Sequence, residues 1–337
     1  MAPSLKRRRF SVGNMEQYQE ICCLGEGGFG AVFKARDRET GRAVAIKHVD
    51  PVLGSVHREA SMLEDAGRDN PFVIAFHGMA RYPDSVVDLR LVMECGGQSL
   101  SHVLRQLRLR PAGALPLPEP TVCAIMRQLL MGAQKMHDNR VIHRDIKPGN
   151  IVVSDDFKLI KFCDFGLAMH MNARPPYNAA GTRGYMAPEM LLGKRDYGAV
   201  VDTWSLGCVM AEIITGRKLF QGVSDDDTDQ LRAILYVLGA PDETTWPWFS
   251  STEFATNEMP KHAPMHRHNF LRMLFPDTTL SDEGFQVLSG LLTCNPDKRL
   301  TAAAALKHPW FAKNVYAPEQ PKKEVPWPKR RRIHALF

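Results

Sequence analysis

Two neighbouring motifs reveal most about this chain, and they are His143-Arg144-Asp145-Ile146-Lys147-Pro148-Gly149-Asn150 and Asp164-Phe165-Gly166. Their spacing lets a strand hairpin hold a carboxylate, a lysine and an asparagine around one metal–phosphate centre. Phosphoryl transfer needs a group that accepts the hydroxyl proton, ligands for Mg²⁺, and positive charge on the moving phosphate. Asp145 suits the first role and Lys147 the third, while Asn150 and Asp164 suit the second. A polar turn beside an unrelated Asp-Phe-Gly is the alternative, and the order and spacing of the motifs disfavour it.

A glycine-rich segment upstream carries a G-x-G-x-x-G pattern with a valine two residues later, as Gly25-Glu26-Gly27-Gly28-Phe29-Gly30-Ala31-Val32. A dinucleotide-binding fold uses the same glycines, and Asp50 stands where that fold places an acid. In that fold a helix begins within the motif, whereas Ala31–Ala35 alternates as a strand does. The sequence therefore favours a glycine turn between two strands, in which backbone amides close over phosphates without a Cβ in the way.

A buried strand, Val44-Ala45-Ile46-Lys47, follows this turn and ends in a lysine. Lys47 would hold the α- and β-phosphates if a carboxylate on a helix fixed its ammonium group. Glu59 is the best candidate for that carboxylate, and Glu64 lies within reach on the same predicted helix. A surface lysine that lays its stem along apolar neighbours is the alternative for Lys47.

Composition limits the class of protein. The chain has 337 residues, 44% hydrophobic and 24% charged, which is ordinary for a soluble globular protein of about two domains. We find neither a secretory signal nor an apolar run of about 18 residues, so we expect no membrane span. The seven cysteines are scattered without a C-x-x-C pair, which indicates buried reduced thiols in a cytosolic or nuclear protein.

Charge is divided unevenly along the chain. Of the net charge of +6, residues 1–14 carry +4 and residues 312–337 carry +5, which leaves −3 for residues 15–311. The mildly acidic body argues against direct nucleic-acid binding by the folded part. The basic runs Lys6–Arg9 and Lys329–Arg332 fit nuclear-import signals, and solvated tails without an address fit equally well.

The pattern of secondary structure changes once along the chain. Up to Met93 we expect strands at 19–24, 31–35, 43–49, 73–78 and 89–93, with one helix at 56–64. After Gly96-Gly97 the sequence is mostly helical, and we expect helices at 100–107, 122–138, 200–216, 226–238, 282–293 and 302–306. The prediction is an α+β, bilobal fold with a small β-rich N-lobe over 18–94, a hinge at 94–97 and a larger, mostly α-helical C-lobe over 98–311. Residues 1–14 are predicted to be a disordered basic arm, and 312–337 a basic, proline-rich tail.

With these motifs in order, residues 18–311 resemble the eukaryotic protein kinase family. The resemblance extends to Ala187-Pro188-Glu189, to Asp202–Gly207 and to Arg299. Within that family the chain resembles the cyclin-dependent kinases, and a divergent plant F-type member is one interpretation. The stretches Lys218–Gly222 and His308–Phe311 carry this narrower likeness.

The resemblance implies roles for further residues. ATP and Mg²⁺ are the expected cofactors, and adenine is expected to bond the backbone of Glu94 and Gly96 with Met93 as gatekeeper. Asp202 is expected to brace the catalytic loop, which is the motif His143–Asn150, and Glu189 is expected to pair with Arg299. Lys147 two residues after Asp145 is the serine/threonine pattern, and Thr182 supports it. The nucleotide is expected to contact, besides these hinge residues and Lys47, the residues Leu24, Gly25, Glu26, Gly27, Gly28, Phe29, Gly30, Ala31, Val32 and Ala45.

Several departures from the cyclin-dependent pattern limit this transfer. Gly28 and Phe29 replace the inhibitory threonine and tyrosine of that branch. No serine or threonine stands between Asp164 and Gly181, and the usual activating threonine aligns with Tyr177 or its neighbour Asn178. The segment Leu53–Glu59 matches the cyclin-binding stretch in its last two residues alone, so a cyclin partner stays open. Likewise, Met186 replaces the arginine that favours proline after the phosphoacceptor, and proline-directed specificity stays open.

The sequence thus predicts an ATP-dependent protein serine/threonine kinase of cyclin-dependent type, nuclear or cytoplasmic, acting on protein substrates. Other kinases of the branch and the C-terminal domain of RNA polymerase II are the candidate substrates. A catalytically weak ATP-binding scaffold and a cyclin-independent kinase are the alternatives, and a nucleic-acid-binding module is a third class.

Overall fold

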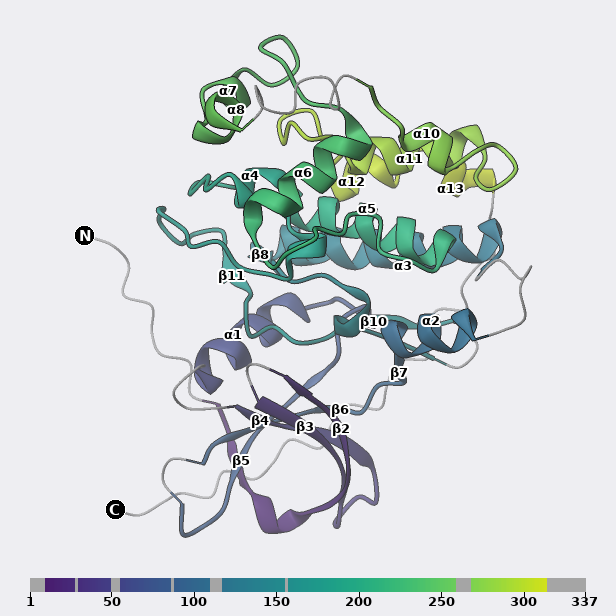
Figure 1. Ribbon diagram of the computed structural model, residues 1–337. Coiled ribbons are helices and arrows are strands. Elements are labelled where there is room, and N and C mark those ends of the chain that lie inside the picture. The colour runs from purple at the N-terminus through teal and green to yellow at the C-terminus, as the bar shows by residue number, and fades with distance from the viewer. Residues whose placement is uncertain are drawn as a thin grey trace.

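The computed structural model describes residues 10–27, 30–49, 55–85, 88–109, 117–154, 157–258 and 268–313. The predictions for Gly28 and Phe29, for the two basic runs and for the tail beyond Lys313 lie outside these residues. Figure 1 shows two lobes, with the β-sheet at one end of the molecule and the helices of the C-lobe at the other. The predicted α+β, bilobal architecture is confirmed.

The N-lobe is built on one six-stranded sheet with the order β1-β5-β6-β4-β3-β2. All five predicted strands exist, and β4 has the predicted bounds. The strand expected at 73–78 begins three residues later, because Val73 instead forms an isolated bridge with Phe162. The five strands are β2 (Tyr18–Gly27), β3 (Gly30–Asp37), β4 (Ala43–Val49), β5 (Phe76–Arg81) and β6 (Arg90–Glu94).

The sixth strand corrects the predicted disordered arm. Residues Val12–Asn14 form β1, which pairs in parallel with β5 from Val12 opposite Met79 to Asn14 opposite Arg81. Phe10 also packs edge-on against Phe76, with ring centroids 5.5 Å apart. Composition predicted disorder from the basic cluster, but an open sheet edge supplies backbone partners to a short segment whatever its charge.

Helix α1 (Val56–Ala66) crosses the N-lobe and carries Glu59. Ser55 caps the helix by accepting a hydrogen bond from the backbone of Arg58, which fixes where the first turn begins. The buried face is formed by Glu59, Ala60, Leu63 and Ala66, at helical spacing. The cap and this apolar face together point the first-turn carboxylate inward.

The C-lobe is organised around α3 (Glu119–Asp138) and α5 (Val200–Thr215). Helix α5 is buried on nearly every side, as expected for a helix that is hydrophobic all round. Figure 1 shows the shorter helices beyond α5, on the side away from the sheet. They are α4 (Pro188–Leu191), α6 (Asp227–Leu238), α7 (Pro247–Ser250), α8 (Glu253–Asn257), α10 (Leu271–Leu274), α11 (Asp282–Leu291), α12 (Ala302–Ala305) and α13 (Pro309–Lys313).

The elements between the two cores position the motifs. Strands β9 (Ile151–Val153) and β10 (Ile160–Phe162) form a hairpin between the two motifs, as the sequence predicted. Strand β7 (Gln98–Ser99) joins this hairpin and leads into α2 (Leu100–Arg108). Strands β8 (Val141–Ile142) and β11 (Met169–His170) pair with each other on either side of the motifs. The short 3-10 helices η1, η2 and η3 cover Met15–Gln17, Pro148–Asn150 and Arg183–Tyr185.

Two further expectations concern membrane-spanning helices and the cysteines. No helix in the described part of the chain is long and apolar enough to cross a membrane. All seven cysteines are free, but Cys22 and Cys23 are exposed on β2, so the expectation that the thiols are buried is wrong for these two.

Candidate active site

The ammonium of Lys47 lies between two carboxylates. Its Nζ is 2.7 Å from Oε1 of Glu59 and 2.8 Å from Oδ1 of Asp164, and the lysine is 4% exposed. Glu64, the alternative partner, lies exposed on α1. Burial acts to lower the pKa of Lys47, but the two carboxylates outweigh it and hold the pKa above its ordinary value. A positive charge is therefore fixed where β4 and α1 meet the start of the activation segment, which runs from Asp164 to Glu189.

The catalytic loop brings Asp145 together with three polar side chains. Its Oδ1 accepts a hydrogen bond from the hydroxyl of Thr182 at 2.7 Å, and its Oδ2 accepts one from Nδ2 of Asn150 at 2.9 Å. Lys147 places Nζ 2.8 Å from Asp145 Oδ2 and 2.7 Å from Thr182 Oγ1. An alcohol hydroxyl therefore already donates to this carboxylate beside an ammonium group.

Asp202 holds the backbone of the catalytic loop from inside α5. Its carboxylate accepts hydrogen bonds from the backbone N–H groups of His143 and Arg144, each at 2.9 Å. Nε2 of His137 lies 2.9 Å from the same carboxylate. Burial acts to raise the pKa of Asp202, but the hydrogen bonds and charge of His137 and His143 hold the pKa below its ordinary range.

These contacts are needed because part of the site has unusual backbone geometry. Arg144 has φ = 68° and Asp164 has φ = 62°, in the left-handed region that side chains other than glycine rarely adopt. Such residues persist where surrounding bonds over-determine them, and they gather at functional sites. Arg144 directly precedes Asp145, and Asp164 contacts Lys47.

The donor set of Asn150 and Asp164 fits Mg²⁺. Asn150 uses its amide NH₂ to donate to Asp145, and Asp164 uses Oδ1 for Lys47 and for the backbone N–H of Gly166. Within the described part of the chain, Oδ1 of Asn150 and Oδ2 of Asp164 accept no hydrogen bond. The described part of the chain has no cluster of three His, Cys, Asp or Glu side chains, and Mg²⁺ prefers one or two protein oxygens completed by phosphates.

The glycine-rich segment forms the hairpin between β2 and β3, so a strand and not a helix follows it. The register pairs Gly25 with Val32, Glu26 with Ala31 and Gly27 with Gly30, which excludes the dinucleotide-binding alternative. Gly30 has φ = 129°, and a Cβ there would lie 1.8 Å from the carbonyl oxygen of His48. The segment predicted to cover phosphates therefore joins two strands, and position 30 admits only glycine.

The predicted adenine contacts lie on neighbouring strands. Ala45 on β4 is opposite Met93 on β6, both buried, and Leu24 is exposed on β2. The side chain of Glu94 accepts two hydrogen bonds from Lys161, at 2.6 and 2.7 Å, and one from the backbone of Ala75. The carboxylate of Glu94 is therefore occupied in fixing the hinge to β10. Gly96 packs against β9, where a Cβ would lie 2.7 Å from Val152 Cγ2.

The end of the activation segment is anchored by a buried ion pair. Nη1 and Nη2 of Arg299 each lie 2.7 Å from a carboxylate oxygen of Glu189, and both side chains are 0% exposed. Arg299 also donates to the backbone carbonyls of Thr293, Cys294 and Val200. The pairing suggested by the resemblance is thus present, with its remaining donors satisfied.

Two polar residues of the site escaped the sequence interpretation. His137, on α3, orients Asp202, and Tyr197 bonds Arg144 and the activation segment. Each lies more than fifty positions from its partner, as His137 is 65 residues from Asp202 and Tyr197 is 53 from Arg144. No local spacing could have found them.

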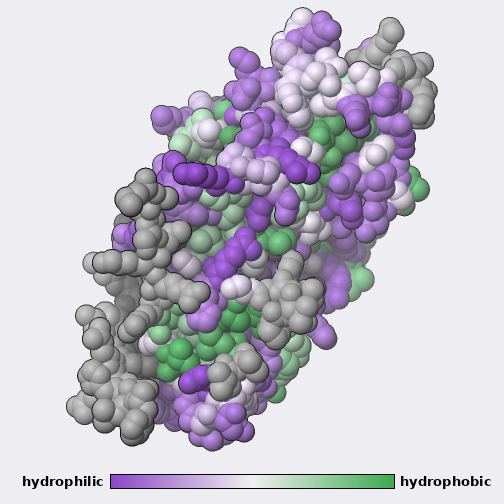
Figure 2. Space-filling view, turned by 90° about the vertical axis from the view of Figure 1, so that its left-hand side faces the viewer, coloured by the Kyte–Doolittle hydropathy of each residue, from purple (hydrophilic) through white to green (hydrophobic). Residues whose placement is uncertain are grey.

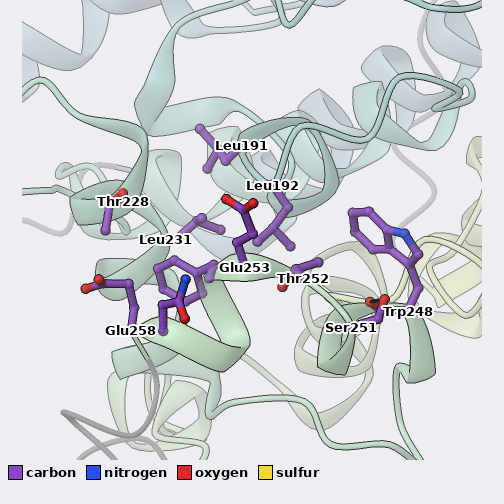
Figure 3. A pocket seen from close by; sticks show the side chains of 11 residues that line it. Leu191, Leu192, Thr228, Leu231, Trp248, Ser251, Thr252, Glu253 and Glu258 are labelled. Carbon is purple, nitrogen blue, oxygen red and sulfur yellow. Dashed lines mark hydrogen bonds between the residues drawn. The ribbon is translucent and has the colours of Figure 1, made fainter.

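A separate cavity of about 500 Å³ lies in the C-lobe, among α4, α6, α7 and α8. Figure 3 shows Leu231 on one side of it and Trp248 on the opposite side. None of its lining residues is among the predicted site residues. It is therefore distinct from the nucleotide and acceptor centre.

Comparison with known proteins agrees with the geometry. The family model described as protein kinase domain matches residues 18–311. The putative cyclin-dependent kinase F-2 of Oryza sativa subsp. japonica is 42% identical over 316 residues, which cover 90% of this chain and 93% of the relative.

Two G-type relatives are longer. Cyclin-dependent kinase G-1 of Oryza sativa subsp. indica is 35% identical over 88% of this chain and 43% of its own length. Cyclin-dependent kinase G1 of Arabidopsis thaliana is 34% identical over 92% of this chain and 51% of its own length.

The chain thus spans nearly the whole F-type relative and about half of each G-type relative. The matched family covers both lobes and every motif of the site, and the relatives place the chain among kinases named for cyclin dependence. The chain belongs to the protein kinase family, and it is a serine/threonine kinase of the cyclin-dependent kinase type.

Proposed function

We propose that the chain uses Mg²⁺–ATP to phosphorylate serine or threonine side chains of nuclear proteins, with a cyclin as its partner. One observation carries the catalytic part. The hydroxyl of Thr182 donates to Asp145 at 2.7 Å while Lys147 contacts both side chains, so the site receives an alcohol oxygen beside one carboxylate and one ammonium.

Each charged group then has a place in the transfer. Lys47, fixed by Glu59, would bind the α- and β-phosphates of ATP, and its buried position keeps that charge aligned. Asn150 and Asp164 would hold Mg²⁺, which neutralises charge on the phosphates when bound. Asp145 would orient the acceptor hydroxyl and take its proton, and Lys147 would stabilise charge on the transferred group.

The partner part of the proposal rests on the relatives' names and on the surface of α1. His57 is exposed on this helix, while Val56 and Met62 are partly buried there. Figure 2 shows hydrophobic surface in the lower half of the side that it displays and again near the top, with hydrophilic side chains between. Because Lys47 and Glu59 are already paired within this chain, we propose that a cyclin raises an existing activity rather than creating it.

The substrate and location parts rest on the sequence. The runs Lys6–Arg9 and Lys329–Arg332 support nuclear import, although cytoplasmic protein is also expected before import. Other cyclin-dependent kinases and the C-terminal domain of RNA polymerase II are the candidate substrates. Direct nucleic-acid binding by the folded body is not part of the proposal, because residues 15–311 carry a net charge of −3.

The test uses the full chain, purified from a host without plant cyclins, with labelled ATP and Mg²⁺. Four acceptors are compared: a repeat peptide of the polymerase C-terminal domain, an activation-segment peptide of a cyclin-dependent kinase, and a version of each with tyrosine as the only hydroxyl. We expect label on serine or threonine peptides alone, and a higher rate after addition of a cyclin recovered from native extract by affinity to the chain.

The outcomes separate the parts of the proposal. ATP–Mg²⁺ binding without label on any peptide would identify a scaffold. Full activity with no cyclin recovered would identify a cyclin-independent kinase. Salt-dependent retention of residues 15–311 on DNA would overturn the charge argument.

A further inference from the structure

The activation segment, from Asp164 to Glu189, is ordered beside the catalytic loop, whose Arg144 is bonded to neutral oxygens. Phosphorylated activation segments are ordered through new pairs between phosphate and arginine. Here no serine or threonine stands between Asp164 and Gly181. The segment nevertheless reaches Asp145 through Thr182, so another group must hold it.

Uncharged groups occupy the arginine donors that face the segment. Arg144 donates through Nε to the carbonyl oxygen of Leu167 at 2.7 Å and through Nη1 to the hydroxyl of Tyr197 at 2.8 Å. The same Nη1 also reaches the carbonyl oxygen of Asn178, at the longer distance of 3.4 Å. Arg58, on α1, donates to the carbonyl oxygen of Ala168 at 2.7 Å. All four acceptors are neutral oxygens, and three of them belong to the segment itself.

Tyr197 connects the arginine with the middle of the segment. The residue lies between α4 and α5 and is 4% exposed. Its hydroxyl accepts from Arg144 and donates to the carbonyl oxygen of Asn178 at 2.7 Å. Its ring packs edge-on against the ring of Tyr177, with centroids 5.4 Å apart. The backbone N–H of Tyr177 also donates to the carbonyl oxygen of Arg195, at 2.8 Å.

The pinned residues lie close to the reacting centre. Between Asn178 and Thr182 the chain passes Gly181, which has φ = 124° and lies against the carbonyl oxygen of Arg144, where a Cβ would be 2.6 Å away. The next residue, Thr182, bonds Asp145 and Lys147. A shift at Asn178 would therefore be transmitted over four residues to the proton-accepting carboxylate.

We propose that Tyr197 is a positioning residue that orders the activation segment in place of a phosphate. Its phenol takes one guanidinium N–H of Arg144 and returns its own hydrogen to the segment, so no added charge is needed. The kinase is therefore catalytically competent with its activation segment unphosphorylated. This inference rests on the chain's kinase activity.

The test is Tyr197→Phe in the full chain, which removes the hydroxyl and keeps the buried ring. Because hydrogen bonds to charged groups contribute about 1.5–3 kcal/mol, we expect kcat to fall at least about tenfold. KM for ATP should stay unchanged, since Tyr197 contacts none of the predicted nucleotide residues. Chymotrypsin should cleave faster after Tyr177, which is half-buried in the segment against the ring of Tyr197. The control is Tyr236→Phe, at a tyrosine that is 53% exposed on α6, and we expect it to match wild type.

Three results bear on the inference directly. Unchanged kcat and unchanged chymotryptic cleavage after Tyr177 in Tyr197→Phe would overturn it. Loss of wild-type activity on phosphatase treatment would also overturn it, because a phosphate, for example on Tyr177, would then be the organiser. Cleavage after Tyr177 is measured without turnover, so an inactive wild type with a Tyr197-dependent cleavage rate would refute the proposed function and leave the ordering role standing. A thermal melt that matches wild type shows that Tyr197→Phe has kept the fold.

Discussion

The catalytic loop and the activation segment meet at Asp145, and they are held by different kinds of interaction. The catalytic loop is fixed by a buried charge, the carboxylate of Asp202, which accepts two backbone N–H groups from inside α5. The activation segment is charged at its ends, where Asp164 pairs with Lys47 and Glu189 with Arg299. Its middle is held by neutral oxygens and by the rings of Tyr177 and Tyr197.

The difference follows from what each region must do. The catalytic loop has unusual backbone at Arg144, and a charged acceptor in a low-dielectric interior offsets that strain. The middle of the activation segment needs only to be kept in one place, and any group that reaches Asn178 can do so. Paired opposite charges are therefore found at the reacting centre and at the anchors, whereas between them two arginines bond neutral oxygens.

The largest effect is expected from Asp145→Asn, because this change removes the proton acceptor at the point where the two regions meet. General base catalysis typically contributes about 10²–10⁴-fold, so kcat should fall by that factor while ATP binding is kept. Initial rates and nucleotide titration measure the two quantities. Asp138→Asn, at an exposed carboxylate that ends α3, is the matched control. Equal rates for Asp145→Asn and wild type would remove Asp145 from its assigned role.

The anchor at the end of the activation segment is tested by Arg299→Met. The change leaves the carboxylate of Glu189 buried without its partner, which typically costs about 3–5 kcal/mol in the free energy of unfolding. Lys194→Met, which removes the partner of the exposed Asp196, should cost at most about 1 kcal/mol. Urea unfolding of the two variants gives the comparison, and similar losses would show that burial does not separate these ion pairs.

The charge under the catalytic loop predicts a dependence on pH. The folded pKa of Asp202 is lowered, so its contribution to stability is present above the unfolded pKa of about 3.9 and is lost as the pH falls from there through the lower folded pKa. Asp202→Asn should be less stable than wild type by about 1–3 kcal/mol at pH 7. The difference should shrink below about pH 4, because the wild type then loses the same charge. Asp138→Asn should follow the wild-type curve, and a constant gap between Asp202→Asn and wild type over this range would contradict the assignment.

Much of the fold could be predicted from local pattern, and the exceptions have physical causes. The apolar run within 43–49 and the helical spacing from Val56 predicted elements close to their observed bounds, because the strand is buried along most of its length and the helix on one face. The order at Val12–Asn14 was missed, since pairing with a sheet edge depends on β5 and not on the arm's own composition. Strand β5 begins at Phe76 and not at Val73 as predicted, because Val73 pairs with Phe162 of β10 across the two lobes.

The sequence alone determined which charged groups this protein carries and in what order, because phosphoryl transfer restricts those residue types and their spacing. It also determined the two-lobed division, since periodicity reports which face of each element is buried. Only the tertiary structure decided that Lys47 pairs with Glu59, that His137 supports Asp202, and that Tyr197 bonds both Arg144 and the activation segment. Those contacts join residues far apart in the chain, and a polar side chain's partner is set by packing that no local pattern records.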